Sequence, residues 1–177
     1  QTIDKLNSIT VDIGIFGNYY KESKEVRKIF EKAYDTALAK TDRATYQAME
    51  AFVHNLNTMH SRAGAQVPFS SINFGTDTSP EGRMVMKNYL LSVDAGLGKN
   101  ETPIFPISIF KIKEGINYNP GDPNYDLFKL SCKVSAKRLF PNFSFMDSPF
   151  NAQYYKGDFN TQVCYMGCRT RVIGNVV

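Results

Sequence analysis

The sequence predicts an α/β fold that begins with a pair of helices. Apolar residues recur at helical spacing between Ser23 and His60, and charged residues fill the other faces. After Gly64, short segments rich in β-forming residues alternate with helical segments. The run from Ile104 to Ile112 is nearly continuously apolar, as expected for a strand buried on both faces of a parallel sheet.

The two amphipathic segments at the start predict a helical hairpin. The first helix is expected over 23–40 and the second over about 42–60, with Thr41 or Asp42 capping the start of the second. Their apolar stripes consist of Val26, Ile29, Phe30, Ala33 and Ala37 in the first helix and Met49, Phe52, Val53, Leu56 and Met59 in the second.

The next two elements are a strand and a capped helix. The segment 66–74 predicts a short strand followed by a loop, with Pro68 at the first residues of the strand or on an edge. Ser79-Pro80-Glu81 supplies an N-cap, a proline at the first helical position and an acidic residue in the first turn. This helix is expected to end at Gly96.

The apolar run 104–112 is the next predicted strand. A helix follows from Asp122-Pro123, carries an apolar stripe and ends before Pro141, since proline cannot continue a helix. A last strand around 161–165 leads into Met166-Gly167-Cys168. Strand, helix, strand, helix is the rhythm of an α/β fold.

Composition excludes several classes of protein. With 177 residues, 42% of them hydrophobic, the chain can bury one core. The net charge of +4 is small, and basic and acidic residues interleave through 21–43, which predicts a solvated helix face and no direct nucleic-acid contact. Three cysteines argue against a secreted disulfide scaffold. Without a signal peptide or an apolar run of about 20 residues, the protein is expected in the cytoplasm, away from membranes.

Cys168, on a glycine-hinged turn after the last strand, has three interpretations from its neighbours. A nucleophile needs a base, and the only histidines, His54 and His60, are on the predicted second helix. A metal ligand would pair with Cys164, but a C-x3-C spacing without a nearby histidine is half of a tetrahedral site, so no metal is expected in this chain. An ordinary buried cysteine is the third.

The motifs around Cys168 and after Ser61 favour another role. The segment Tyr165-Met166-Gly167-Cys168-Arg169-Thr170 and the block Ser61-Arg62-Ala63-Gly64-Ala65-Gln66-Val67-Pro68-Phe69-Ser70-Ser71-Ile72-Asn73-Phe74-Gly75-Thr76-Asp77-Thr78 together resemble the anaerobic, glycyl-radical ribonucleotide reductases. The resemblance continues, with lower specificity, through 79–83, 101–106, 117–122 and 137–142.

The resemblance implies a fold and a place in a larger enzyme. The chain would be a single central fragment, 1–177, of the large catalytic subunit of an anaerobic ribonucleoside-triphosphate reductase, from a ten-stranded α/β barrel. Residues 61–177 would supply barrel strands, helices and the cysteine loop. Residues 1–60, mainly helical, could serve dimerisation and an effector region, although their apolar stripes equally suit burial against their own barrel.

The resemblance also implies residue roles. Cys168 would become a thiyl radical that removes the 3′ hydrogen of the ribose and later returns it, since an S–H bond is close in strength to a ribose C–H bond. Gly167 would give the loop backbone freedom and let the substrate approach closely. Ser70, Ser71 and Asn73 are candidate substrate contacts because strand C-termini face a barrel's active site, although turn hydrogen bonding is the ordinary role of such residues. Arg62 could bind a phosphate or neutralise a helix C-terminus.

Cofactors and partners follow from the same resemblance. The glycyl radical is expected on a segment absent from this chain, because Gly174 lies only six residues after Cys168 and is followed by Asn175 where the family has an aromatic residue. Formate, or a thiol system, would be the reductant, and a zinc site would lie in a missing C-terminal part. Cys132 is expected to pack in a helix, and the chain alone is expected to be inactive.

The implied partners are ribonucleoside triphosphates as substrates, deoxynucleotides and ATP as effectors, a second copy in a homodimer, and a radical S-adenosylmethionine iron–sulfur activating enzyme. Two alternatives remain. One is a glycyl-radical enzyme with a non-nucleotide substrate, and the other is a nucleotide-binding or dimerisation module without turnover.

Overall fold

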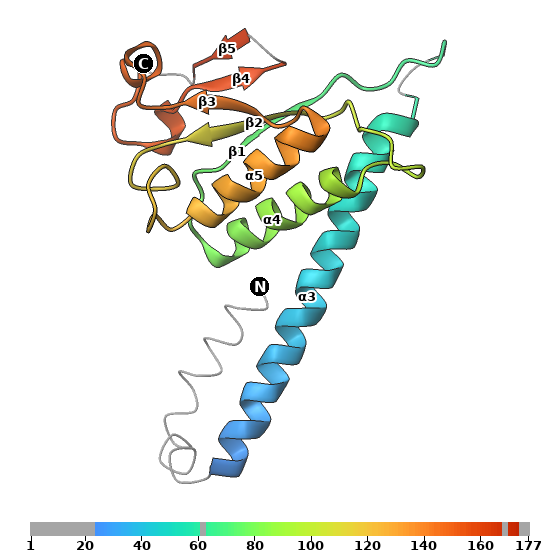
Figure 1. The fold of residues 1–177 in the computed structure, drawn as a ribbon, viewed down its shortest axis with the longest axis vertical. Helices are drawn as coiled ribbons and strands as arrows, with labels where there is room; N and C mark the ends of the chain where they lie inside the picture. The colour runs from blue at the N-terminus through green and yellow to red at the C-terminus, as the bar shows by residue number, and fades with distance from the viewer. Residues whose placement is uncertain (1–23, 61–62, 168–169, 174–177) are drawn as a thin grey trace. The chain divides into compact units, whose positions relative to one another are not determined.

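The computed structural model describes residues 24–60, 63–167 and 170–173 (Figure 1). Three residues discussed above lie outside the described residues: Arg62 and Cys168, for which roles are predicted, and Gly174, which is not expected to carry the glycyl radical. The chain divides into two compact units, residues 1–43 and 44–177, and each is described by itself. No helix among the described residues is long and apolar enough to cross a membrane.

The predicted helical hairpin is wrong, because one helix, α3 (Lys24–Thr58), replaces it. No glycine or proline interrupts residues 39–44, so nothing in the local sequence stops the helix. The Thr41 hydroxyl donates to the Ala37 carbonyl at 2.9 Å, one turn back, which is the bond of a threonine inside a helix rather than at its start.

A three-stranded parallel sheet forms the centre of residues 44–177. Its order is β1 (Ser71–Phe74), β2 (Ile107–Ile112) and β3 (Asn142–Phe145). β1 and β2 confirm two predicted strands, with shorter bounds. β3 was not predicted; it starts immediately after Pro141 and pairs with β2 from Ile109↔Asn142 to Ile112↔Phe145.

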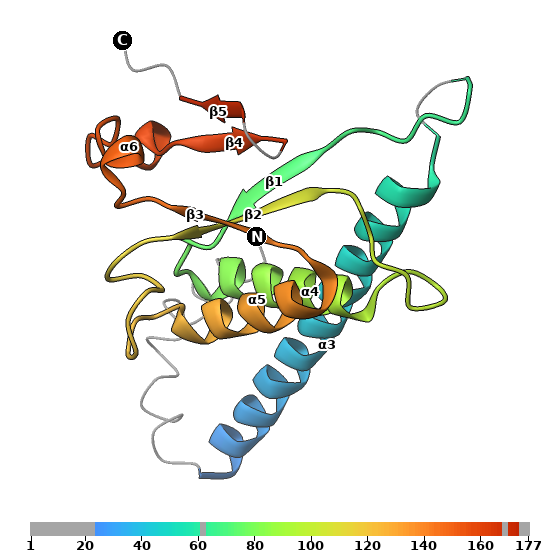
Figure 2. The same ribbon diagram turned by 45° about the horizontal axis from the view of Figure 1, so that its top comes forward.

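Helices α4 (Pro80–Ala95) and α5 (Tyr125–Arg138) connect these strands and lie on the same face of the sheet (Figure 2). The predicted start and end of α4 are confirmed: the Ser79 hydroxyl accepts from the Gly82 N–H at 3.1 Å, and Gly96 takes φ 79° at the C-cap. α5 starts later than predicted, after Asn124, and ends at Leu139 in the left-handed conformation. The α/β prediction is therefore confirmed for this sheet.

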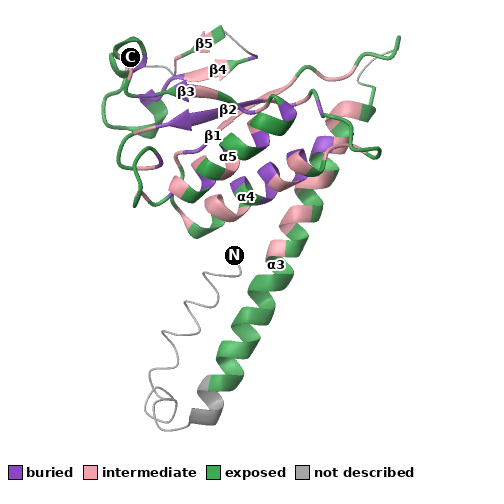
Figure 3. Ribbon diagram, viewed as in Figure 1, coloured by how far each residue is buried: buried purple, intermediate pink, exposed green. Residues whose placement is uncertain are grey.

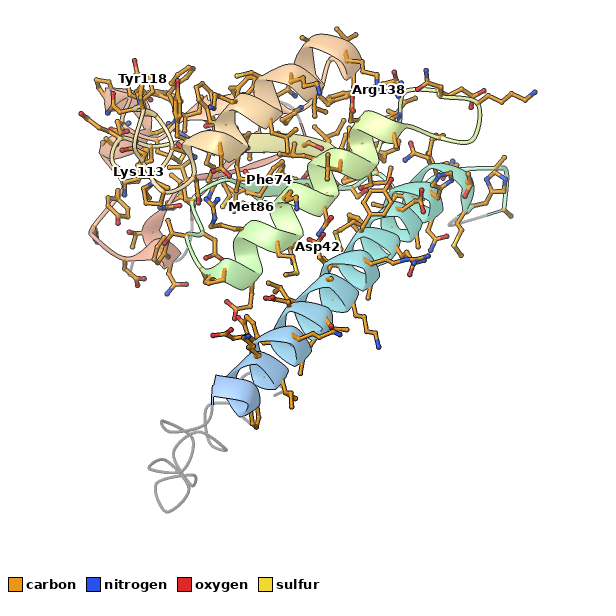
Figure 4. All side chains as sticks on the ribbon, turned by 60° about the horizontal axis from the view of Figure 1, so that its bottom comes forward. Asp42, Phe74, Met86, Lys113, Tyr118 and Arg138 are labelled. Atoms are coloured by element: carbon orange, nitrogen blue, oxygen red, sulfur yellow. The ribbon has the colours of Figure 1, made fainter. Side chains whose placement is uncertain are left out.

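The hydrophobic core lies between the sheet and these helices. Phe74 and Phe110 contact each other edge to face, with ring centroids 5.4 Å apart, and Met86 of α4 packs in the same cluster (Figure 4). A second cluster joins Val53 of α3 to Tyr89, Leu90 and Val93 of α4 and Val134 of α5. β2 is almost continuously buried, as its apolar sequence predicts (Figure 3).

The last part of the chain crosses the other face of the sheet (Figure 2). It contains α6 (Pro149–Ala152), the 3-10 helix η1 (Phe159–Thr161) and an antiparallel hairpin of β4 (Cys164–Met166) and β5 (Thr170–Val172). The predicted strand at 161–165 is shifted, because Asp158 caps the N-terminus of η1 and Thr161 belongs to that turn. β4 ends at Met166 and β5 begins at Thr170, and Cys168 lies between them in the sequence.

Candidate active site

The turn of the β4–β5 hairpin starts at Gly167, immediately before Cys168. Gly167 has φ 62°, in the left-handed region that glycine adopts without steric cost. A Cβ added here would also lie 3.3 Å from the ring of Phe69. The backbone freedom predicted for Gly167 is therefore used, while its role in substrate approach stays a prediction.

Asn73 of β1 binds the backbone of Tyr165 through both ends of its amide. Its Nδ2 donates to the Tyr165 carbonyl at 2.7 Å, and its Oδ1 accepts from the Tyr165 N–H at 2.8 Å. Because side chains alternate along a strand, Asn73 lies on the face opposite Phe74 and therefore away from α4. The substrate contact expected of Asn73 stays a prediction, but its principal described partner is the hairpin.

Ser71 continues this pairing two residues earlier on the same face of β1. Its hydroxyl oxygen accepts from the Gly167 N–H at 3.2 Å. The neighbouring Ser70 does not join the hairpin: its hydroxyl donates to the Pro68 carbonyl at 3.4 Å, and its carbonyl accepts from the Ile107 N–H at 2.8 Å. Of the predicted site residues, the structure thus brings together Ser71, Asn73 and Gly167.

Lys111 of β2 is a site residue that the sequence analysis missed. It is 6% exposed, and its Nζ donates to Cys164 Sγ at 3.2 Å and to Gln162 Oε1 at 3.5 Å. Its partners in the described part of the chain are thus a thiol and an amide. Two polar atoms near this position, Ser144 Oγ and Gln162 Nε2, are buried without a hydrogen-bond partner among the described residues. The signal in the sequence was a lysine inside an otherwise apolar run.

Arg171 joins the second strand of the hairpin, β5, to Phe150 and Tyr154. Its guanidinium lies 3.6 Å from the ring centroid of Phe150 and 4.8 Å from that of Tyr154. Nη1 donates to the Phe150 carbonyl at 2.7 Å, and Nη2 to the Tyr154 hydroxyl at 3.3 Å. Stacking of a guanidinium on aromatic rings combined with hydrogen bonds fixes its position better than either contact alone.

The two described cysteines, Cys132 and Cys164, are free thiols. No group of three or more potential metal ligands occurs among the described residues. Cys164 is a half-buried free thiol on β4. Cys132 is an exposed free thiol on α5, so the prediction that it packs is wrong. Partial burial still raises the pKa of the Cys132 thiol, the larger effect, while a hydrogen bond with Ser131 lowers it.

Comparisons with known proteins agree with the motifs. The sequence profile of the family described as anaerobic ribonucleoside-triphosphate reductase matches residues 8–175. Three curated proteins named anaerobic ribonucleoside-triphosphate reductase are similar to the chain. The protein of Escherichia coli (strain K12) is 32% identical over 171 residues, which cover 96% of this chain and 23% of that protein. That of Salmonella typhimurium is 36% identical over 76% of this chain and 18% of its own length. That of Enterobacteria phage T4 is 37% identical over 78% of this chain and 22% of its own length. The chain therefore spans about a quarter of these relatives or less.

Proposed function

The chain belongs to the anaerobic ribonucleoside-triphosphate reductase family, and from this premise we propose that it forms part of the catalytic wall of such an enzyme, with Cys168 as the reacting thiol. The observation that carries the proposal is the hairpin, whose backbone is bound by Ser71 and Asn73 up to Gly167, the residue before Cys168. The motifs that contain these residues are those that resemble the family.

The reaction proposed for this site is the reduction of a ribonucleoside triphosphate to the deoxyribonucleoside triphosphate. Cys168 takes the 3′ hydrogen atom of the ribose, the 2′ hydroxyl leaves as water, and the same sulfur returns a hydrogen to C3′. A glycyl radical, on a segment outside this chain, supplies the unpaired electron that makes the sulfur reactive. Formate, oxidised to carbon dioxide, or alternatively a thiol system, oxidised to a disulfide, supplies two electrons; together with two protons these place a hydrogen on C2′ and release the hydroxyl as water.

The two faces of the sheet support a barrel wall. Helices α4 and α5 cover the apolar face, while Asn73 and Lys111 lie on the face that carries the hairpin. In a ten-stranded α/β barrel the helices would be outside and this polar face inside, where the substrate binds. Ser70 and Arg62 are proposed as substrate contacts, whereas Ser71 and Asn73, on the inner face, bind the backbone of the hairpin.

Partners and regulation complete the proposal. Deoxynucleotides and ATP would act as effectors, α3 would contribute to a homodimer, and a radical S-adenosylmethionine iron–sulfur enzyme would install the glycyl radical. The zinc site would lie in a C-terminal part of the enzyme, and this chain alone would be inactive.

A substitution in the complete reductase tests the assignment of Cys168. Cys168→Ser should abolish nucleotide reduction, because a serine O–H bond is too strong to exchange hydrogen with ribose, while ribonucleotide binding persists. Cys132→Ser is the matched control, since Cys132 is exposed on α5 and away from the sheet face that carries the hairpin. Nucleotide reduction retained by Cys168→Ser would remove this sulfur from the mechanism.

A further inference from the structure

Two side chains of β1 bind β4 as the edge of a neighbouring strand would. Ser71 and Asn73 are two residues apart and lie on one face of β1, and their partners Tyr165 and Gly167 are also two residues apart, in the opposite chain direction. Side chains thus replace the backbone ladder that would otherwise hold the hairpin. The contact joins positions 92 residues apart in the chain.

The chemistry of the two side chains matches a backbone more closely than it matches a sugar. The planar amide of Asn73 offers one acceptor and one donor, and it meets the N–H and C=O of a single residue at 2.8 and 2.7 Å. An aspartate could keep the acceptor, but it would place a carboxylate oxygen against the Tyr165 carbonyl. Ser71 supplies the acceptor for Gly167, so the last hydrogen bond lies one residue before Cys168.

Arg171, on the second strand of the hairpin, β5, binds Phe150 of α6. Its stacking on Phe150 and its hydrogen bond to the Phe150 carbonyl hold β5 three residues after Cys168. Residues on both sides of Cys168 in the sequence are therefore anchored, at Gly167 and Arg171. Hydrogen-atom transfer requires the reacting atoms near van der Waals contact, and misplacement by about 1 Å can cost about 10²-fold in rate.

We propose that Asn73 and Ser71 are positioning residues, which set the place of the Cys168 thiol by binding the hairpin backbone, rather than ligands of the substrate. The inference rests on the proposed function of Cys168. It reassigns two residues that the family resemblance favours as substrate contacts, and it makes the polar face of β1 a support for the hairpin.

The test uses the complete reductase that contains this chain. Asn73→Ala should lower kcat by about 10²-fold, the cost of a misplaced reacting group, with little change in the KM for the ribonucleotide. Ser71→Ala should lower kcat by about tenfold, as for one lost hydrogen bond, and Ser71→Thr, which keeps the hydroxyl, should restore it. Ser131→Ala is the matched control and should leave kcat unchanged, because the Ser131 hydroxyl donates within α5, to the Phe128 carbonyl at 2.7 Å, and does not contact the hairpin.

Hydrogen exchange separates local positioning from a general loss of structure. In Asn73→Ala, the amides of 163–167 should exchange faster while those of α4 and β2 keep their protection. A rise of about tenfold in the dissociation constant of the ribonucleotide, with kcat at saturation unchanged, would identify the residues as substrate ligands and overturn the inference. Faster exchange across the whole sheet would reduce them to ordinary structural residues and also overturn it.

The failure of the proposed function gives a different result. If Cys168→Ser retained turnover, the thiol assignment would fall. Unchanged exchange at 163–167 in Asn73→Ala would instead refute the positioning inference alone, because the hairpin would then be held without that amide.

Discussion

Replacing Arg138 by methionine should lower the free energy of unfolding by about 2–4 kcal/mol, because hydrogen bonds from a buried guanidinium to backbone carbonyls are lost and each bond to a charged group is worth about 1.5–3 kcal/mol. Arg138 lies in the last turn of α5 and is 4% exposed. Nη2 donates to the Asp94 carbonyl at 2.6 Å and to the Ala95 carbonyl at 3.1 Å, and Nη1 donates to the Asn100 carbonyl at 2.8 Å. The first two acceptors belong to the last turn of α4, which lacks helical partners for its carbonyls. Arg138 is labelled in Figure 4.

The magnitude follows from what methionine leaves behind. It fills the space of the arginine stem, but the Ala95 and Asn100 carbonyls lose their arginine donor, each at a cost of about 1–3 kcal/mol when it stays buried. The Asp94 carbonyl keeps a donor, Lys137 Nζ, at 3.0 Å. Relief of the desolvated guanidinium offsets part of this sum. Lys137→Met is the control: its ion pair with Asp94, at 2.9 Å, is half exposed and should be worth less than about 1 kcal/mol. Urea unfolding followed by circular dichroism measures both, and equal losses for the two variants would refute the reasoning.

Three further predictions concern stability. Burial, the larger effect, raises the pKa of Tyr89 from 10.0 to about 12. The free energy of unfolding should therefore keep its full value below pH 10 and fall by about 2–3 kcal/mol as the pH rises to 12. In urea titrations Tyr89→Phe should lack this pH-dependent part, and a pH profile identical to that of the unchanged protein would contradict the assignment. Gly75→Ala should lower the free energy of unfolding by about 1–3 kcal/mol, because the added Cβ would lie 2.6 Å from the Lys111 carbonyl oxygen and the residue has φ 123°. Gly115→Ala, which has open space around the added Cβ, should lower it less, and thermal melts compare the two variants. Leu139→Gly should stabilise the chain by up to about 1 kcal/mol, because an 80% exposed leucine occupies φ 65°, and a lower midpoint in urea would count against this.

Local chemistry explains which elements the sequence could predict. The helix from Ser79 to Gly96 has a cap at each end, and both act as their residue types suggest. The boundary predicted at Thr41 failed because a residue that can cap a helix is also tolerated within one when no glycine or proline stops the chain. β3 was missed because Pro141 was interpreted only as the end of a helix, and the four residues after it were assigned to no element.

The site was predictable in its residues but not in its contacts. Motifs singled out Ser71, Asn73 and Gly167, but no local pattern says which face of β1 the hairpin crosses, since these contacts join segments more than 90 residues apart. Lys111 was missed for a related reason. A lysine in an apolar strand can be read as an edge or surface residue until a thiol is found beside its ammonium group.

The two faces of the parallel sheet differ in kind, and this difference connects the fold to the proposed chemistry. Parallel strands are usually buried by apolar packing on both faces. Here the face under α4 and α5 is apolar, whereas Ser71, Asn73 and Lys111 occupy the other, beside Ile109. A hydroxyl or an ammonium group buried for packing alone would cost free energy unless hydrogen-bonded, and each of these groups is bound to β4 or to Gly167, the residue after it. The polarity of this face is therefore explained by the hairpin that it holds, and the hairpin in turn is the segment that leads to Cys168.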